Sequence, residues 1–417
     1  MKIAIIGCGA SGMMAAIAAH QSNYSVDITI FEHNEEPGRK LLSTGNGKCN
    51  ITNRDIVPDC YHSEHTDFAM DIIHEFDAES AINFFMNQGL LLSDKQGYVY
   101  PLSEQAITVR DCLYNAITEA GIEVIFGSDI SSICKEENGF VITNHDKAYV
   151  YDKVILACGS YAGITKKNRI ASDRDGYSLA YHLGHSINPV KSALTALVCS
   201  EPFFKDIAGV RANANLALIA NNRVIATELG EVQFTDYGLS GIPSMQLSYL
   251  VNKYAHLKLE VMIDLLPGVD EETYCNIMQM RIITKRGVSA SRFFTGILNS
   301  KLNSLIMKLA DIDEDELLSE ENEDKFIYAL SLARALKVTV KGTKSFEHAQ
   351  VCTGGVDVSE VDNKLRSKLV PGLYIVGEML DVDGRCGGYN LQWAWASGHI
   401  AGYTAGLEVN NDYDRSD

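Results

Sequence analysis

Residues 2–12 read Lys-Ile-Ala-Ile-Ile-Gly-Cys-Gly-Ala-Ser-Gly, a short apolar run that leads into the pattern G-x-G-x-x-G. An apolar run of this length is typical of a buried parallel strand. Residues 12–20 follow it and are rich in strong helix formers, and residues 26–31 make a second apolar run. The first part of the chain therefore predicts a β-α-β unit.

The glycines of this unit have the spacing of a dinucleotide-binding fingerprint. Gly7 permits a tight turn, Gly9 lets the backbone approach a pyrophosphate, and Gly12 permits close packing of the helix on the strand. The helix N-terminus would face the phosphates with unpaired N–H groups and a positive dipole end. Glu32 closes the second strand, where an acidic side chain accepts hydrogen bonds from ribose hydroxyls. The full set favours a dinucleotide site over an ordinary glycine turn.

The composition is that of a globular protein and restricts the possible partners. The chain has 417 residues, of which 46% are hydrophobic and 22% charged, so a sizeable core is available and disorder is excluded as the main state. The net charge of −18 argues against binding to nucleic acid or to an anionic membrane surface. The eleven histidines show no metal-ligand spacing.

The cysteines and the N-terminus indicate a cytoplasmic protein. The ten cysteines contain no C-x-x-C pair, so free thiols in a reducing compartment are expected. Residues 3–19 carry no charge and imitate a signal peptide, but the fingerprint glycines interrupt them. The run is also shorter than the ~20 apolar residues that a membrane helix needs.

The rest of the chain changes character twice. Further strands of the first part are expected at 122–126, 139–144 and 149–157. The middle part alternates apolar and polar residues and predicts an antiparallel sheet or barrel, with a hairpin at 214–227, strands at 257–264 and 336–341, and helices between these strands. The last part, 369–402, returns to an α/β pattern and is expected to join the first sheet.

Two later segments add cofactor-binding features. Residues 36–53 form a polar, glycine-rich loop that could wrap an extended cofactor and place Arg39 and Lys40 near its phosphates, although a basic surface loop is the alternative. Residues 372–378 predict a strand that delivers the carboxylate of Glu378. Residues 387–392 then open a helix whose N-terminus could stabilise negative charge on a reduced flavin. With a single fingerprint in the chain, these features favour FAD over NAD.

On these motifs the chain resembles the BaiN-like FAD flavoproteins of bacteria. This family has the glutathione-reductase-like superfold, includes a bile-acid dienone reductase, and is labelled in part as aminoacetone oxidase family FAD-binding enzymes. The resemblance covers essentially the whole chain and is carried by residues 7–12, 38–53, 230–241, 353–356 and 377–392. It implies an α/β fold: a Rossmann-like FAD-binding domain at 1–190 and 342–417, an inserted antiparallel β-barrel substrate domain at 191–266 and 334–341, and a helical insert at 267–333.

The resemblance also implies which residues bind the cofactor. Pyrophosphate and ribose contacts fall on the fingerprint and the end of the second strand, and the polar loop adds further contacts. Ile130 would contact adenine through its backbone, and later loops would face the ribityl chain and the isoalloxazine. The predicted cofactor-binding set is Gly7, Gly9, Ala10, Ser11, Gly12, Glu32, Arg39, Lys40, Ser43, Gly45, Asn50, Ile130, Ala157, Gly159, Gly377, Glu378, Asp381, Gly388, Tyr389, Asn390 and Leu391. Catalytic acid–base residues are not identified; Tyr389, Arg385 and Tyr237 are candidates by neighbourhood alone.

The expected activity is that of an FAD-dependent oxidoreductase with non-covalent FAD and NAD(P)H as a transient co-substrate. Flavin N5 would carry the hydride chemistry. The expected reaction is reduction of an activated C=C bond in an enone-like or dienone-like small molecule, without nucleic acid or membrane partners. An amine oxidase acting on an aminoacetone-like substrate, and a non-catalytic FAD-binding protein of redox sensing or RNA modification, stay open. Residues 273–310 contain six basic and no acidic residues, which could attract an anionic substrate or form a solvated helix face.

Overall fold

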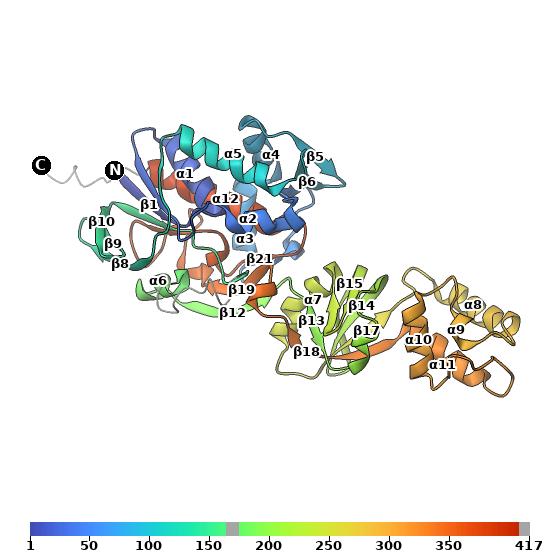
Figure 1. Cartoon of the computed structure of the whole chain (residues 1–417). Coiled ribbons are helices and arrows are strands. Elements are labelled where there is room, and N and C mark those ends of the chain that lie inside the picture. The colour runs from blue at the N-terminus through green and yellow to red at the C-terminus, as the bar shows by residue number, and fades with distance from the viewer. Residues whose placement is uncertain (164–174, 408–417) are drawn as a thin grey trace, which may run out of the picture. The chain divides into compact units, whose positions relative to one another are not determined.

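The computed structural model describes residues 1–163 and 175–407. The chain forms two compact units, one comprising Met1–Lys191 with Gln350–Asp417 and the other Ser192–Ala349 (Figure 1). The second segment of the first unit begins at Gln350 and not at the expected residue 342. Residues between 342 and 349 instead form hydrogen bonds with residues of the second unit. The Lys344 amide donates to the Ala196 carbonyl at 2.9 Å, and the Thr195 hydroxyl donates to the His348 carbonyl at 3.2 Å.

A five-stranded parallel sheet forms the centre of the first unit. Its order is β20-β11-β1-β2-β7, with β1 at Lys2–Ile6, β2 at Asp27–Phe31, β7 at Glu123–Ile125, β11 at Lys153–Leu156 and β20 at Leu373–Ile375. The predicted β-α-β unit and the return of the last part of the chain to the first sheet are therefore confirmed.

One strand prediction in this region is wrong. Residues 149–157 are not a single strand, because β10 (Lys147–Tyr151) pairs with β9 (Gly139–Asn144) in another sheet and β11 begins at Lys153. The break falls at Asp152, whose amide donates to the Lys2 carbonyl at 3.0 Å. The apolar character of both strands hid this change of sheet from the sequence pattern.

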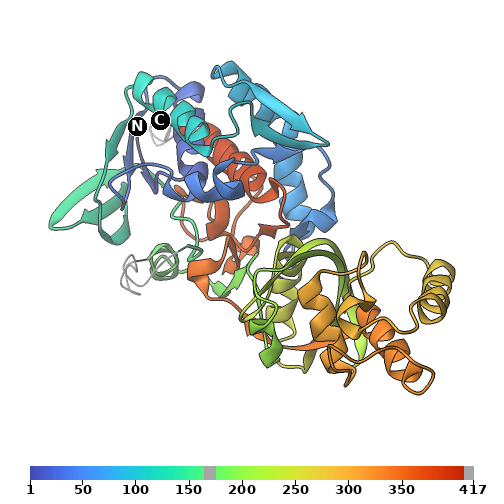
Figure 2. The ribbon, with the colours of Figure 1, turned by 45° about the vertical axis from the view of Figure 1, so that its right-hand side comes forward.

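Two buried helices pack closely against each other beside the sheet. They are α1 (Ala10–Ser22) and α12 (Tyr389–Leu407), which lie side by side in Figures 1 and 2. A Cβ atom at Gly402 would overlap the backbone carbonyl of Ala15, so glycine permits this close approach. Both helices are apolar on nearly all sides, as expected for helices inside a core.

The other elements of the first unit surround this centre. They are α2 (Arg39–Ser43), β3 (Thr52–Asn53), β4 (Tyr61–His62), α3 (Thr66–Glu75), α4 (Ala78–Asn87), β5 (Leu92–Lys95), β6 (Tyr98–Pro101), α5 (Ala106–Glu119), β8 (Ile130–Glu136), α6 (Gly176–His182), β19 (Val351–Val356) and β21 (Asp383–Gly384). Strand β12 (Ile187–Ala193) pairs with β19 and contains the boundary between the units.

The second unit contains a closed barrel of order β13-β16-β15-β14-β17-β18. The predicted hairpin is confirmed, because β14 and β15 pair around Asn221 and Asn222, both of which have positive φ. The barrel strands are β13 (Leu197–Cys199), β14 (Arg211–Ala220), β15 (Arg223–Thr235), β16 (Gly238–Ser240), β17 (Leu259–Asp264) and β18 (Leu336–Thr343). The helices of this unit are α7 (Ile242–Lys253), α8 (Glu271–Thr284), α9 (Ala290–Phe293), α10 (Ser300–Leu309) and α11 (Glu323–Arg334).

The second unit has its own core. In β17 the residues alternate between buried and half-buried, with Leu259, Val261 and Ile263 inside, as the sequence pattern predicted. The same core includes Phe293 from α9 and Phe326 from α11, whose ring centroids lie 4.9 Å apart. Helices and barrel therefore share one hydrophobic core. Among residues 1–163 and 175–407, no helix is both long and apolar enough to span a bilayer.

Candidate cofactor and active site

The fingerprint glycines divide into two that pack and one that faces open space. Gly7 has a φ of 108°, and a Cβ atom there would overlap the carbonyl oxygen of Ala157. A Cβ at Gly12 would overlap the carbonyl oxygen of Gly7. A Cβ at Gly9 would meet no atom within 4 Å, and the N-terminus of α1 has no side-chain cap. This turn therefore offers free N–H groups and an unobstructed approach, which fits a bound phosphate.

Glu32 is held beside this turn. The amide of Cys8 donates to its Oε2 atom at 2.7 Å, and the amide and side chain of Asn34 donate to Oε1 at 2.8 and 2.6 Å. Glu32 is only 6% exposed, so its carboxylate is fixed in position. A carboxylate accepts about four hydrogen bonds, which leaves capacity for a ribose hydroxyl.

The polar loop after α2 has the backbone and side-chain features of a ligand cradle. Gly45, Asn46, Gly47 and Cys49 all have φ between 55° and 83°. Such successive turns expose backbone N–H groups to one side. Asn50 follows, buried, with an Oδ1 atom that has no hydrogen-bond partner. A buried unsatisfied acceptor costs about 1–3 kcal/mol, so this atom fits a donor from a bound cofactor.

Two predicted cofactor segments meet at Glu378. The Lys40 ammonium forms an ion pair with the Glu378 carboxylate, and the Ser160 hydroxyl donates to the same oxygen at 2.9 Å. Glu378 follows Gly377, which has a φ of 65°. A Cβ atom at Gly377 would lie 2.6 Å from Ser11 Oγ, so this position has no room for a side chain. Arg39, the first residue of α2, instead donates to Asn34 Oδ1 at 3.2 Å. The structure thus brings the polar loop, the fingerprint helix and the strand after 372 together.

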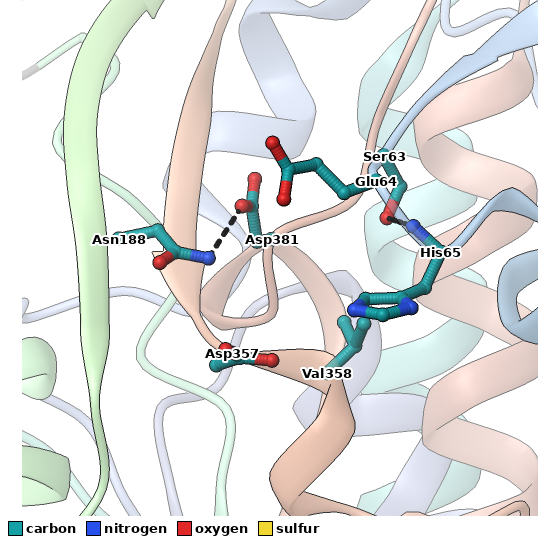
Figure 3. Close-up of a pocket in the computed structure, with 7 residues that line it drawn as sticks. All are labelled: Ser63, Glu64, His65, Asn188, Asp357, Val358 and Asp381. Carbon is teal, nitrogen blue, oxygen red and sulfur yellow. Dashed lines mark hydrogen bonds between the residues drawn. The ribbon is translucent and has the colours of Figure 1, made fainter.

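Asp381 lies in a small polar pocket rather than with this ion pair (Figure 3). Its Oδ1 atom accepts from the Gly354 amide and its Oδ2 atom from Asn188 Nδ2, both at 2.9 Å. Burial raises the pKa of Asp381, and these two hydrogen bonds oppose that effect. Gly355 permits a close approach of β19 to the segment that carries Asp381, because a Cβ atom at Gly355 would lie 2.7 Å from the Met379 carbonyl oxygen. The structure therefore explains the motif at 353–356 as packing for the segment that carries Asp381.

The loop at the N-terminus of α12 is fixed by its own polar side chains. Asn390 accepts from the Gly384 amide at 2.7 Å and donates to the Gly384 carbonyl at 2.8 Å. The Tyr61 hydroxyl donates to the Tyr389 carbonyl at 2.9 Å, and burial raises the pKa of the Tyr389 phenol. Gly388 has a φ of 92° and a built Cβ 2.7 Å from the backbone of Thr52. Asn390 and Tyr389 therefore hold the loop shape that a flavin would meet.

The remaining predicted contacts lie around these segments. Ile130 begins β8, is buried, and follows a segment in which the Ser128 amide donates to the Glu32 carbonyl at 2.8 Å. Ser43 caps its own helix by donating to the Lys40 carbonyl at 2.8 Å. Ala10, Ala157 and Leu391 are part of the packing around α1, β11 and α12, and Gly159 has a φ of 73° with open space beside it.

The cysteines near these loops are buried or half-buried side chains. Burial raises the pKa of Cys49 and of Cys158 to about 12, and none of the ten cysteines, all of which the structure describes, forms a disulfide. Such thiols stay protonated at neutral pH and are poor nucleophiles. Within the described ranges, no cluster of three or more His, Cys, Asp or Glu side chains is placed to hold a metal ion.

One polar pair in this region was missed by the sequence analysis. His62 Nδ1 lies 3.1 Å from Asp383 Oδ2, and Asp383 is almost fully buried. Asp383 lies inside the 377–392 motif, but nothing in the local pattern indicates a partner on β4. Tyr237, an acid–base candidate, lies in the second unit with the Lys344 ammonium 3.6 Å from its ring centroid.

The basic segment 273–310 is largely used inside the second unit. Arg281 donates to the Phe293 and Thr295 carbonyls, Arg286 pairs with Glu320 and Glu323, and Lys308 lies 3.8 Å from Asp206. Arg281 thus links α8 to α9 and the residues after it, and Arg286 and Lys308 are paired with acidic side chains of the same unit. These contacts favour the structural interpretation of this segment over attraction of an anionic substrate.

Comparison with known proteins gives relatives that match nearly the whole chain. The 3-dehydro-bile acid delta(4,6)-reductase of Clostridium scindens is 37% identical over 407 residues, covering 97% of this chain and 98% of that protein. The ribosomal RNA dihydrouridine synthase of Escherichia coli is 29% identical over 401 residues, covering 94% and 95%. The protein of the same description from Haemophilus influenzae is 26% identical over 405 residues, covering 95% and 96%.

The fingerprint geometry and these relatives define the class of the protein, which is an FAD-dependent oxidoreductase. Residues 1–404 match the family described as HI0933-like protein Rossmann domain, and the chain belongs to this family. The expected resemblance to flavoproteins that include a bile-acid reductase is therefore confirmed.

Proposed function

We propose that the protein reduces a carbon–carbon double bond conjugated to a carbonyl group, with non-covalent FAD as cofactor and NAD(P)H as electron source. The observation that carries this proposal is the reductase relative, 37% identical over 97% of the chain, whose name describes double bonds at positions 4 and 6 of a 3-dehydro-bile acid. An enone or dienone of a small apolar molecule is the corresponding substrate class.

The two synthase relatives favour a second candidate substrate, a uracil base of ribosomal RNA. Reduction of uridine to dihydrouridine also saturates a C=C bond conjugated to a carbonyl, so the bond chemistry is the same for both candidates. The net charge of −18 and the pairing of Arg286 and Lys308 with acidic side chains support the small molecule.

FAD, when bound, supplies hydride chemistry at its N5 atom. We assign the pyrophosphate to the α1 N-terminus at Gly7, Gly9, Ala10, Ser11 and Gly12, and the ribose to Glu32. Ile130 would contact the adenine, and the small residues Ala157 and Gly159 would let the cofactor approach closely. The remaining contacts of the cofactor would come from Arg39, Lys40, Ser43, Gly45, Asn50, Gly377, Glu378, Asp381, Gly388, Tyr389, Asn390 and Leu391.

The charges of this site suit the proposed cofactor. Lys40 forms an ion pair with Glu378, and Glu378 also accepts a hydrogen bond from Ser160. Because Ser160 would still stabilise the Glu378 carboxylate, the Lys40 ammonium could turn to a phosphate of the cofactor. The N-terminus of α12 would stabilise negative charge that develops on a reduced flavin.

The electron source is inferred from the single fingerprint. A second G-x-G-x-x-G and a C-x-x-C pair are both missing from the sequence, so NAD(P)H and substrate would react with one flavin in turn and give ping-pong kinetics.

Anaerobic mixing tests the proposal. NADH or NADPH should bleach the flavin absorbance, and a conjugated enone added afterwards should restore it, whereas a saturated ketone should not. A ribosomal RNA fragment in place of the enone tests the second candidate. Flavin that NAD(P)H leaves oxidised while a primary amine bleaches it would instead assign the protein to the amine oxidases.

A further inference from the structure

A two-residue sheet places a histidine against a buried carboxylate. Strand β21 pairs antiparallel with β4, in the register Asp383 to His62 and Gly384 to Tyr61. His62 Nδ1 lies 3.1 Å from Asp383 Oδ2. The side chain of Asp383 is 2% exposed and that of His62 is 12% exposed, so the histidine is the more accessible member of the pair.

The charge of the buried carboxylate is stabilised chiefly by His62. Its Oδ1 atom has no hydrogen-bond partner, and burial raises the pKa of Asp383. The hydrogen bond from His62, the charge of that imidazole and a hydrogen bond from the Thr353 side chain lower it again. A buried carboxylate is stabilised by a protonated neighbour, so the pair is suited to hold one proton for transfer.

The same small sheet is attached to the loop that we assign to the flavin. The Tyr61 hydroxyl donates to the Tyr389 carbonyl at 2.9 Å. Gly384 exchanges two hydrogen bonds with the Asn390 side chain, at 2.7 and 2.8 Å. A displacement of β4 against β21 would therefore also displace the N-terminus of α12. Three hydrogen bonds therefore link the sheet that carries the pair to the loop.

A small polar pocket is lined by residues that are close in the chain to both members of the pair (Figure 3). Its volume is about 50 Å³, more than the ~10–15 Å³ that one water molecule needs. Ser63 directly follows His62 in the chain, and Asp381 lies two positions before Asp383. The charge of Asp381 raises the pKa of Asp383. The pocket is lined by Ser63, Glu64, His65, Asn188, Asp357, Val358 and Asp381. Water in this pocket could bring protons to the pair.

We propose that His62, oriented by Asp383, is the proton donor of the reduction, and that the pocket of Glu64, His65 and Asp381 supplies it with protons. This inference rests on the proposed function. FAD, when bound and reduced, would supply a hydride to the β-carbon of the enone, and the π electron pair would move to the α-carbon. The α-carbon then takes a proton from His62 Nε2, while Nδ1–H stays bound to Asp383. Neutral His62 regains its proton from water, so that each turnover adds two electrons and two protons to the double bond.

The two half-reactions separate this role from a structural one. In His62→Gln, NAD(P)H should reduce the flavin at the wild-type rate, within about twofold. Reoxidation by the enone should slow by about 10²–10⁴-fold, the usual contribution of a general acid. In the wild type this second step should slow as pH rises, and in His62→Gln it should not depend on pH over the same range. His74→Gln, on the exposed side of the neighbouring helix α3, is the matched control and should behave as wild type.

A second readout does not need turnover. The hydrogen bond to Asp383 should give the Nδ1 proton of His62 a downfield NMR resonance, which disappears in His62→Gln and in Asp383→Asn. FAD content and melting temperature of each variant show whether the fold is retained. His62→Gln protein that keeps FAD and reoxidises at the wild-type rate would overturn the inference, as would an equal loss of both half-reactions. A wild-type enzyme that no conjugated carbonyl compound reoxidises would refute the proposed function itself.

Discussion

Replacement of Gly9 by valine should separate cofactor binding from folding. Gly9 has φ −86° and ψ −167°, an extended conformation that any residue adopts, and a side chain there would enter open space. Valine is a poorer helix N-cap than glycine, so a loss of up to about 1 kcal/mol in apoprotein stability is expected. The same side chain would occupy the space through which a pyrophosphate must approach the α1 N-terminus.

The effect on FAD affinity should be far larger. If the valine prevents about two charge-assisted hydrogen bonds from backbone N–H groups to phosphate, each worth about 1.5–3 kcal/mol, the loss is about 3–6 kcal/mol. That corresponds to a dissociation constant raised on the order of 10²–10⁴-fold. Titration of apoprotein with FAD, followed by flavin fluorescence, measures the affinity. Urea denaturation of the apoprotein measures stability without the contribution of bound ligand.

Gly12→Ala is the matched comparison. Its Cβ would overlap the Gly7 carbonyl, so the apoprotein should lose about 1–3 kcal/mol or more through overpacking. The two glycines should therefore have opposite signatures, with Gly9 affecting mainly binding and Gly12 mainly stability. A Gly9→Val protein that binds FAD as tightly as the wild type would show that the phosphates lie elsewhere. A Gly9→Val apoprotein destabilised as strongly as Gly12→Ala would contradict the reading of Gly9 as a residue facing open space.

Three further predictions concern buried groups. Glu32→Gln removes the charge that would accept from a ribose hydroxyl, so FAD should bind about ten- to a hundredfold more weakly; unchanged affinity in the same titration would mean that the ribose is held elsewhere. Burial raises the pKa of Cys352 to about 11, so iodoacetamide should modify the exposed Cys134 and Cys275 first in the folded protein, and mass spectrometry that finds Cys352 among the earliest sites would contradict this. Burial lowers the pKa of His399 from 6.5 to about 4. The unfolded chain therefore takes up this proton at higher pH than the folded protein, and stability should fall by about 3 kcal/mol between pH 6.5 and 4, measured by urea denaturation. His399→Phe should lack this part of the fall, and an equal fall in both proteins would assign it to other groups.

The parts of the site that could be predicted are those set by local spacing. The fingerprint at residues 7–12 specifies a turn, a helix start and a close contact within one β-α-β unit, and the structure has all three. The hairpin at Asn221 and Asn222 was likewise predictable, because these residues tolerate the positive φ that the turn requires. The single strand expected over 149–157 was wrong, since an apolar run does not reveal which sheet each half will join.

The parts that could not be predicted join residues far apart in the chain. Lys40 and Glu378 are separated by 338 positions, and His62 and Asp383 by 321. The resemblance to flavoproteins assigned Lys40 and Glu378 to one cofactor, but their ion pair follows only from the folded sheet. The partner of Asp383 depends on the antiparallel register of two-residue strands, which are too short to leave a periodic pattern.

The most direct test of the central claim uses the reduced enzyme without NAD(P)H. Protein reduced by light under anaerobic conditions is mixed with a conjugated enone, and flavin absorbance and product mass are followed over a single turnover. The proposed function predicts that the flavin is reoxidised and that one molecule of the saturated ketone forms for each flavin. Flavin that stays reduced with every conjugated carbonyl compound, but is reoxidised by oxygen with release of peroxide, would contradict it.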